Sequence, residues 1–184
     1  MADEPAPERA AARVALGIDP GTAATGYGVV RSRGDSMALV ACGVIPTAAG
    51  MPPSERLQTL YVGLLGLIDR YRPTEAAVEA LFFNKNVRTA LAVGQARGVA
   101  LLAAAHRGLT VAEYAPLQVK QSIAGYGRAS KEQIQRMLPV LLNIDFVPEP
   151  DDAADAVAIA ICHLHLSALA RVLRARQEGN GANP

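Results

Sequence analysis

The sequence predicts an α/β protein whose mixed five-stranded sheet is flanked by helices. Three extended segments follow one another between about residues 14 and 45 with short connections, which is typical of an antiparallel meander. Strand and helix patterns then alternate along the chain, so we expect two further strands, parallel to each other, beside the three antiparallel ones. No repeat or interdomain linker interrupts the 184 residues, a length that suits one domain.

The first strand, residues 14–18, is apolar and runs directly into the turn Asp19-Pro20-Gly21. Residues 26–30 resume an extended pattern, so the two segments predict a β-hairpin. An apolar strand is normally buried, and an ionised carboxylate at its end is costly without a partner or a metal. Asp19 therefore either caps the turn, as Asp often does before Pro-Gly, or is placed there for chemistry.

A third strand over residues 37–45 is followed by a helix that opens at Pro52-Pro53-Ser54. We expect Ser54 to be its N-cap and Pro73 to end it, with leucines at helical spacing in between. Residues 75–81 form the next apolar strand. It again carries one acid near its end, Glu79.

The long helix that we expect to end near Arg107 is built from small and apolar residues. Gly94 and Gly98 lie four residues apart on it, although each Gly costs a helix up to about 1 kcal/mol. This spacing suggests that another backbone approaches closely. We expect a dimer interface here, with apolar area from leucines around the glycines; packing on the subunit's own sheet is the alternative. Those leucines are Leu91, Leu101 and Leu102.

The remaining elements are a strand over residues 109–114, short helices over 116–123 and 130–143, and a long apolar helix from 152 to about 174. Pro139 is expected to bend or break the second short helix. A flexible basic loop, Gly125-Tyr126-Gly127-Arg128, separates the two short helices. We expect disordered tails at residues 1–12 and 175–184, on either side of a single domain over residues 13–174.

Charge is unevenly distributed along the chain. Residues 85–136 carry eight Lys or Arg against two Glu, while the formal net charge of the whole chain is only +1. The basic middle of the chain suggests a surface that binds a polyanion. The charge distribution taken by itself would fit an ordinary solvated surface instead. The sequence opens without a signal peptide and lacks an uncharged apolar run of about 18 residues, so we expect an intracellular protein that does not span a membrane.

Four acids share a position at the end of a core element: Asp19, Glu79, Asp152 and Asp155. Asp152 and Asp155 are three residues apart and share a helix face, and Asp151 and Asp155, four apart, would do the same. The helix macrodipole favours acids in a first turn regardless of function, but it explains neither Asp19 nor Glu79. Converging carboxylates without His or Cys favour Mg²⁺ or Mn²⁺. Four of them would suit a pair of metals about 3.5–4 Å apart that acts on a phosphodiester.

A set of motifs extends this pattern over about residues 14–170: Gly17-Ile18-Asp19-Pro20-Gly21, Thr25-Gly26-Tyr27-Gly28, Val78-Glu79, Gly94-Gln95-Ala96-Arg97-Gly98, Val119-Lys120-Gln121 and Asp152-Ala153-Ala154-Asp155-Ala156. In this order the motifs resemble the RuvC family of Holliday-junction resolvases. No single motif is specific, but the combination is. The resemblance implies a ribonuclease-H-like fold, a homodimer, and magnesium-dependent, symmetric nicking of four-way DNA junctions.

The resemblance also implies roles for individual residues. Two Mg²⁺ ions per active site, for which Mn²⁺ would substitute, would be bound by the catalytic acids Asp19, Glu79, Asp152 and Asp155. The family's junction-contacting aromatic position falls on Phe82, with Phe83 and Lys85 beside it, and its phosphate-contacting lysines match Lys120 and Lys131. Without the resemblance, the two Phe residues would be assigned to the core. Ala80 departs from the Gln of other members, and the doubled acid leaves open whether Asp151 or Asp152 points inward.

The function implied by the resemblance is an endonuclease that resolves Holliday junctions by two-metal hydrolysis in homologous recombination and DNA repair. Its location would be the bacterial cytoplasm, at the nucleoid, and its partner the RuvA–RuvB branch-migration complex. A non-catalytic junction-binding module is one alternative, but it has no reason to retain four acids. An actin/hexokinase-like phosphotransferase shares the strand-Gly-Ile-Asp-x-Gly-Thr pattern, but that fold repeats its core in two lobes and needs a longer chain.

Overall fold

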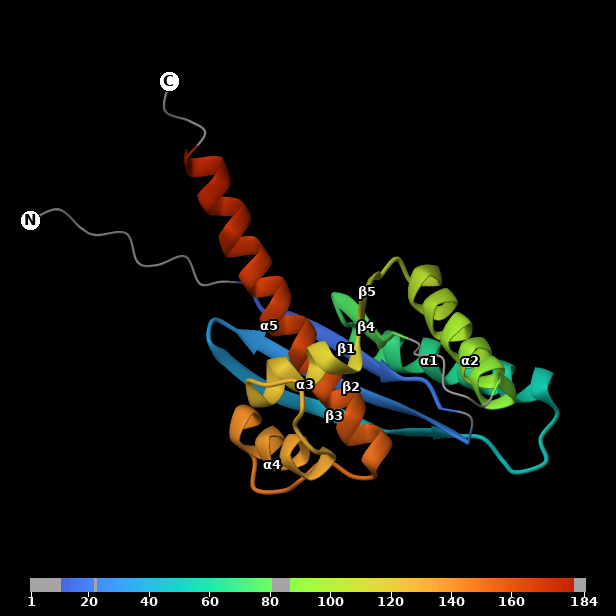
Figure 1. The fold of residues 1–184 in the computed structure, drawn as a ribbon. Coiled ribbons are helices and arrows are strands. Elements are labelled where there is room, and N and C mark those ends of the chain that lie inside the picture. Colours follow the sequence, from blue (N-terminus) through green and yellow to red (C-terminus); the bar gives the residue numbers. More distant parts are fainter. Residues whose placement is uncertain (1–10, 22, 81–86, 181–184) are drawn as a thin grey trace, which may run out of the picture.

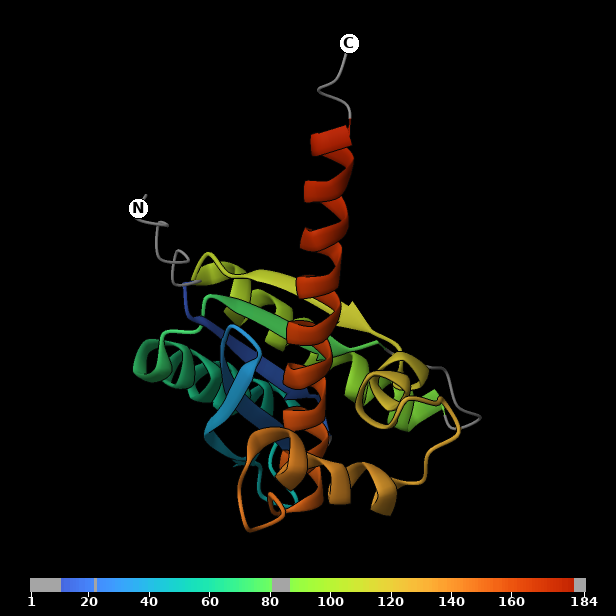
Figure 2. The ribbon, with the colours of Figure 1, turned by 90° about the vertical axis from the view of Figure 1, so that its left-hand side faces the viewer.

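The structure is a computed structural model, and it describes residues 11–21, 23–80 and 87–180. A five-stranded sheet lies at its centre, with the strand order β3-β2-β1-β4-β5, and helices cover both of its faces (Figure 1, Figure 2). The strands are β1 (Arg13–Asp19), β2 (Ala24–Arg33), β3 (Ser36–Pro46), β4 (Glu75–Glu79) and β5 (Thr110–Tyr114).

The pairing confirms the predicted mixed sheet. β1, β2 and β3 form an antiparallel meander, while β4 runs parallel to β1 and β5 runs parallel to β4. Ile18 pairs with Val78 across the parallel strands, so the next residue of each strand, Asp19 and Glu79, emerges at the same edge of the sheet. The other neighbour of β1 places Gly26 opposite Asp19.

Two helical layers enclose the sheet. α1 and α2 pack on one face, while α3, α4 and α5 pack on the other. Leu60, Leu64 and Ile68 of α1 are buried against one face, and each such side chain contributes about 1.5–3 kcal/mol of hydrophobic stabilisation. The helices are α1 (Pro53–Tyr71), α2 (Val87–His106), α3 (Pro116–Ala124), α4 (Lys131–Leu142) and α5 (Asp151–Asn180).

Helix α5 is apolar because it is the core helix of the second layer. It lies between the sheet and the pair α3 and α4, and residues 156–162 are buried on every side. By length and composition alone, its stretch Asp151–Arg174 could cross a membrane, and half of that stretch is buried inside the fold. Burial on all sides requires the same composition, so packing accounts for it.

Three features of the helices differ from the sequence-based expectation. α1 begins at Pro53, and Pro52 rather than Ser54 occupies the N-cap position, because Pro fits the first turn without needing an N–H partner. α4 continues through Pro139, since its buried face of Ile134, Leu138 and Leu142 holds the helix together despite one lost hydrogen bond. α5 extends to Asn180 instead of ending near Arg174, in a segment rich in good helix formers. The division into one domain and two tails stays a prediction.

Candidate metal centre and active site

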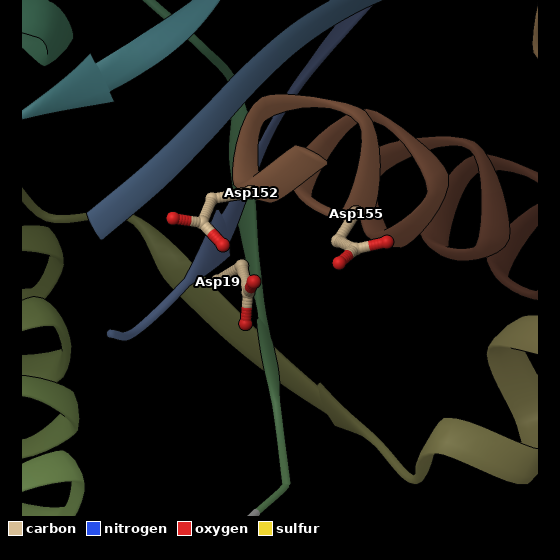
Figure 3. A group of neighbouring side chains, drawn as sticks. All are labelled: Asp19, Asp152 and Asp155. Carbon is tan, nitrogen blue, oxygen red and sulfur yellow. The ribbon is translucent and has the colours of Figure 1, made fainter. Parts of the chain in front are cut away.

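Three carboxylates from two distant parts of the chain meet at the edge of the sheet. Asp19 ends β1, whereas Asp152 and Asp155 lie at the start of α5, and one oxygen from each lies within 4.8 Å of the others. Figure 3 shows the three side chains directed into a common space. Glu79, at the end of the neighbouring strand β4, lines a cavity together with Asp19 and Asp155. The structure thus brings together all four of the acids that the sequence singled out.

Glycines on β1 and β2 allow α5 to lie close enough for this arrangement. A Cβ atom on Gly17 would lie 2.6 Å from the backbone nitrogen of Ala160, and one on Gly28 would lie 2.6 Å from the Cα of Val157. Both distances are shorter than real Cβ contacts, so only Gly fits under the helix. Both glycines belong to motifs in the sequence, although no role in helix packing was predicted for them. Their alternation with other residues along the strands was the signal that could have indicated it.

The cluster carries more negative charge than its surroundings compensate. Burial, together with the nearby carboxylates of Glu79, Asp155 and Asp152, raises the pKa of Asp19 to about 7. Burial, and to a lesser extent Asp155, also raises the pKa of Glu79, which Lys120 partly offsets. Carboxylate oxygens that repel one another at the end of a buried strand fit a hard divalent cation, because the cation removes the repulsion. The donor set therefore fits the Mg²⁺ or Mn²⁺ expected from the sequence.

The acids open into a cavity of about 230 Å³ whose walls come from α3, α4 and α5. Lys120 of α3 and Lys131 of α4 both line it. The Lys131 ammonium donates a hydrogen bond to Asp155 at 2.9 Å, which raises the pKa of Lys131 to about 12. Both lysines predicted to contact phosphate are therefore beside the acids.

The choice between the doubled acids is settled by the rotation of α5. Asp151 is exposed and points out of the cluster, where it accepts a hydrogen bond from Gln135 at 2.9 Å and lies 3.2 Å from the ammonium of Lys131. The hydrogen bond from Gln135 and the charge of Lys131 lower the pKa of Asp151. Asp152 is the neighbour that joins Asp19.

Other residues noted in the sequence lie away from the acids or outside the described part of the chain. Phe82, Phe83 and Lys85 lie outside the described residues. Arg97 forms an ion pair with Glu113 of its own chain. His163 of α5 is buried between Glu75, at 2.7 Å, and the hydroxyl of Tyr114, at 2.9 Å, and so lies away from the acids.

The chain is similar to proteins of one known family. The family model for crossover junction endodeoxyribonuclease RuvC matches residues 15–163. The protein of that name from Pelotomaculum thermopropionicum is 61% identical over 150 residues, covering 82% of this chain and 92% of its own, and the one from Moorella thermoacetica is 60% identical over 148 residues, covering 80% and 89%.

A solved structure extends the similarity to three dimensions. RuvC of Thermus thermophilus in complex with a Holliday junction substrate superimposes with a TM-score of 0.82 at 37% identity, covering 86% of this chain and 96% of its own. The sheet order and the flanking helices are those of a ribonuclease-H-like fold, as the resemblance implied. Motifs, fold and overall similarity agree, and the chain belongs to the RuvC family of crossover junction endodeoxyribonucleases.

Proposed function

We propose that this protein is a structure-selective endodeoxyribonuclease that resolves four-way Holliday junctions by paired, symmetric nicks during homologous recombination and DNA repair. The convergence of Asp19, Asp152 and Asp155 beside Glu79 carries the proposal. Membership of a family named for crossover junction cleavage supports the substrate, as does the junction bound by the related T. thermophilus protein.

The cofactor that we propose is Mg²⁺, two ions per active site, with Mn²⁺ able to substitute. Asp19, Glu79, Asp152 and Asp155 would hold the ions, which when bound supply activation of water and neutralisation of charge on the phosphodiester. Lys120 and Lys131, which line the same cavity as Asp19, Glu79 and Asp155, would orient the phosphate. Cleavage of the bond from phosphorus to the 3′ oxygen would leave a 5′-phosphate and a 3′-hydroxyl, which a ligase can rejoin.

Junction contacts beyond the cavity are assigned to the segment that follows β4. Phe82 and Phe83 come three and four residues after Glu79, and Lys85 follows them. Proteins that bind unpaired DNA usually combine an aromatic side chain, which stacks on a base, with a nearby basic side chain, which contacts a phosphate. We therefore propose that Phe82, Phe83 and Lys85 contact the junction DNA.

A homodimer assembled through α2 would match the two-fold symmetry of the junction. Leu91 and Leu102 on this helix are 64% and 59% exposed, and a side chain at Gly98 would meet open space within the subunit. These positions share one face of α2, so they offer exposed apolar side chains and room for close approach to a second copy. We further propose that the dimer acts in the bacterial cytoplasm, at the nucleoid, with the RuvA–RuvB branch-migration complex.

A synthetic four-way junction, labelled on each strand in turn, tests the proposal. We expect binding with or without metal, and nicks at two symmetry-related positions only when Mg²⁺ or Mn²⁺ is present. A linear duplex of the same sequence is the control and should stay intact. Binding without cleavage under every metal condition would support a junction-binding module instead, and phosphate transfer from ATP would support the phosphotransferase alternative.

A further inference from the structure

The connection between α3 and α4, residues 125–130, has features that the proposed catalytic mechanism does not use. We call it the Tyr126 loop. It begins at Gly125, whose φ of +84° ends α3 in a left-handed turn, and it ends at Ser130, which caps α4 through a hydrogen bond from the backbone nitrogen of Gln133. Figure 2 shows the connection passing outward between the two helices. Its ends are thus held in defined positions.

The loop folds back onto the first turn of α3, next to the acidic cavity. A Cβ atom on Gly127 would lie 3.0 Å from the Cγ of Leu117, so the loop backbone lies directly against the first turn of α3. Leu117 follows Pro116, which lines the cavity, and Lys131 follows the last residue of the loop and lines it as well. Tyr126 is therefore carried by a segment that packs beside one residue of the cavity wall, Pro116, and runs directly into another, Lys131.

The side chains of this loop face solvent in a way that core packing does not explain. Tyr126 is 47% exposed and the adjoining Leu117 is 60% exposed, whereas Ala129 in the same loop is buried and anchors it. Arg128 is exposed too, and the described residues around the loop give it no acidic partner. An exposed aromatic ring followed by an arginine, next to a site built for phosphate, is the combination that binds a base and its backbone.

We propose that the Tyr126 loop is a second DNA-binding element, in which Tyr126 stacks on a base exposed at the crossover and Arg128 contacts a neighbouring phosphate. This inference rests on the proposed junction-resolving function. It assigns to α3 and α4 a role in selecting the junction as well as in holding Lys120 and Lys131. Stacking tolerates any base, so the contact would favour an open crossover over paired duplex without choosing a sequence.

Three variants of one residue separate stacking from other contributions, with junction affinity measured in EDTA so that no strand is cut. Tyr126→Ala should weaken junction binding about tenfold, in line with the loss of one base–aromatic stack. Tyr126→Phe should bind like the unaltered protein because the ring remains. Tyr126→Leu should bind like Tyr126→Ala, and full affinity in the Leu variant would overturn stacking.

Charge is tested separately. Arg128→Ala should lower the dependence of log affinity on log salt by about 0.9, the value for one phosphate contact on duplex DNA, while Tyr126→Ala should leave that slope unchanged. Val62→Ala is a control, since Val62 is an exposed side chain, like Tyr126, but lies on α1, on the other face of the sheet. Its affinity and slope should equal those of the unaltered protein.

The fluorescence of a junction that carries 2-aminopurine at the crossover measures stacking on the base directly. Stacking on tyrosine quenches this fluorophore, so the unaltered protein and Tyr126→Phe should give a lower signal on binding than Tyr126→Ala. Equal signals and equal affinities for all the variants, in a protein that binds and nicks junctions, would overturn this inference and leave the proposed function intact. An unaltered protein that neither binds nor nicks the junction would overturn the proposed function itself.

Discussion

Gly26 lies directly under the first turn of α5, where a Cβ atom on it would be only 2.5 Å from the carbonyl carbon of Asp152. The same glycine pairs with Asp19 on the adjacent strand. One residue without a side chain therefore sets the separation of two carboxylates that are more than a hundred residues apart in sequence. The metal centre depends on close packing between a strand and a helix as well as on its acids.

Gly26→Ala tests this dependence. The added methyl group must push α5 away from β2, which we expect to cost about 1–3 kcal/mol of unfolding free energy and to reduce nicking strongly. Urea unfolding and the junction assay measure the two effects. Gly66→Ala, at an open position on α1, is the control and should be neutral or stabilising. Normal activity in Gly26→Ala would show that the close approach does not set the site.

The two adjacent acids provide a matched pair for the metal ligands. Asp152→Asn should abolish nicking while junction binding survives, because ligation is lost and the basic residues are not. Asp151→Asn should keep nicking, since Asp151 is exposed and bonded to Gln135. Nicking by Asp152→Asn and its loss in Asp151→Asn would reverse the assignment.

The raised pKa of Asp19 predicts how stability depends on pH in EDTA. Its ordinary value is 3.8 and its folded value is about 7, so between these the native state keeps a proton that the unfolded state releases. The contribution of Asp19 is therefore complete below pH 4 and is lost as the pH rises through 7. As the pH rises through 7, the melting temperature of the unaltered protein should therefore fall relative to that of Asp19→Asn.

Mg²⁺ should reverse that loss. At pH 8 the ion should raise the melting temperature of the unaltered protein, because it binds the native carboxylates and not the unfolded chain. Asp19→Asn should gain much less from Mg²⁺. Equal gains in the two proteins would remove Asp19 from the metal site. Glu75 and His163 have lowered pKa values, so their contributions to stability increase as the pH rises. Both groups are present in the unaltered protein and in Asp19→Asn, so the comparison between the two proteins removes these contributions.

Lys120 is expected to contact a phosphate of the junction. Lys120→Ala should weaken junction binding and reduce the salt slope by about 0.9, since one contact fewer releases fewer counterions. Arg70→Ala, an exposed charge on α1, is the control and should leave the slope unchanged. A slope in Lys120→Ala equal to that of the unaltered protein would exclude this lysine from the DNA-binding face.

The dimer prediction uses two helical glycines that both face open space within the subunit. Gly98→Leu on α2 should give a folded monomer that binds junctions poorly and nicks one strand, because the new side chain separates the paired helices. Gly66→Leu on α1 should stay dimeric. Sedimentation velocity distinguishes them. An intact Gly98→Leu dimer, or a monomeric unaltered protein at micromolar concentration, would contradict the α2 interface.

The sequence by itself determined the order of the strands and helices and the acids that end them. Apolar periodicity and turn residues are local signals, so Asp19 and Glu79 could be recognised from the sequence as acids at the ends of buried strands. The parallel pairing of β1 with β4, which brings both acids to one edge, was a finding of the structure. The family motifs then matched Asp152 and Asp155 at the start of the last helix as their partners, with Asp151 left as the alternative to Asp152. None of these steps requires knowledge of how a helix is rotated on the sheet.

Only the tertiary structure decided which of the two adjacent acids joins the cluster. Successive residues of a helix point about 100° apart, and spacing alone cannot choose between Asp151 and Asp152 when both share a face with Asp155. The contact of α5 with Gly26 and Gly28 sets that rotation and directs Asp152 toward Asp19. Packing between segments distant in sequence made the choice, because it is packing that fixes the direction in which a helical side chain points.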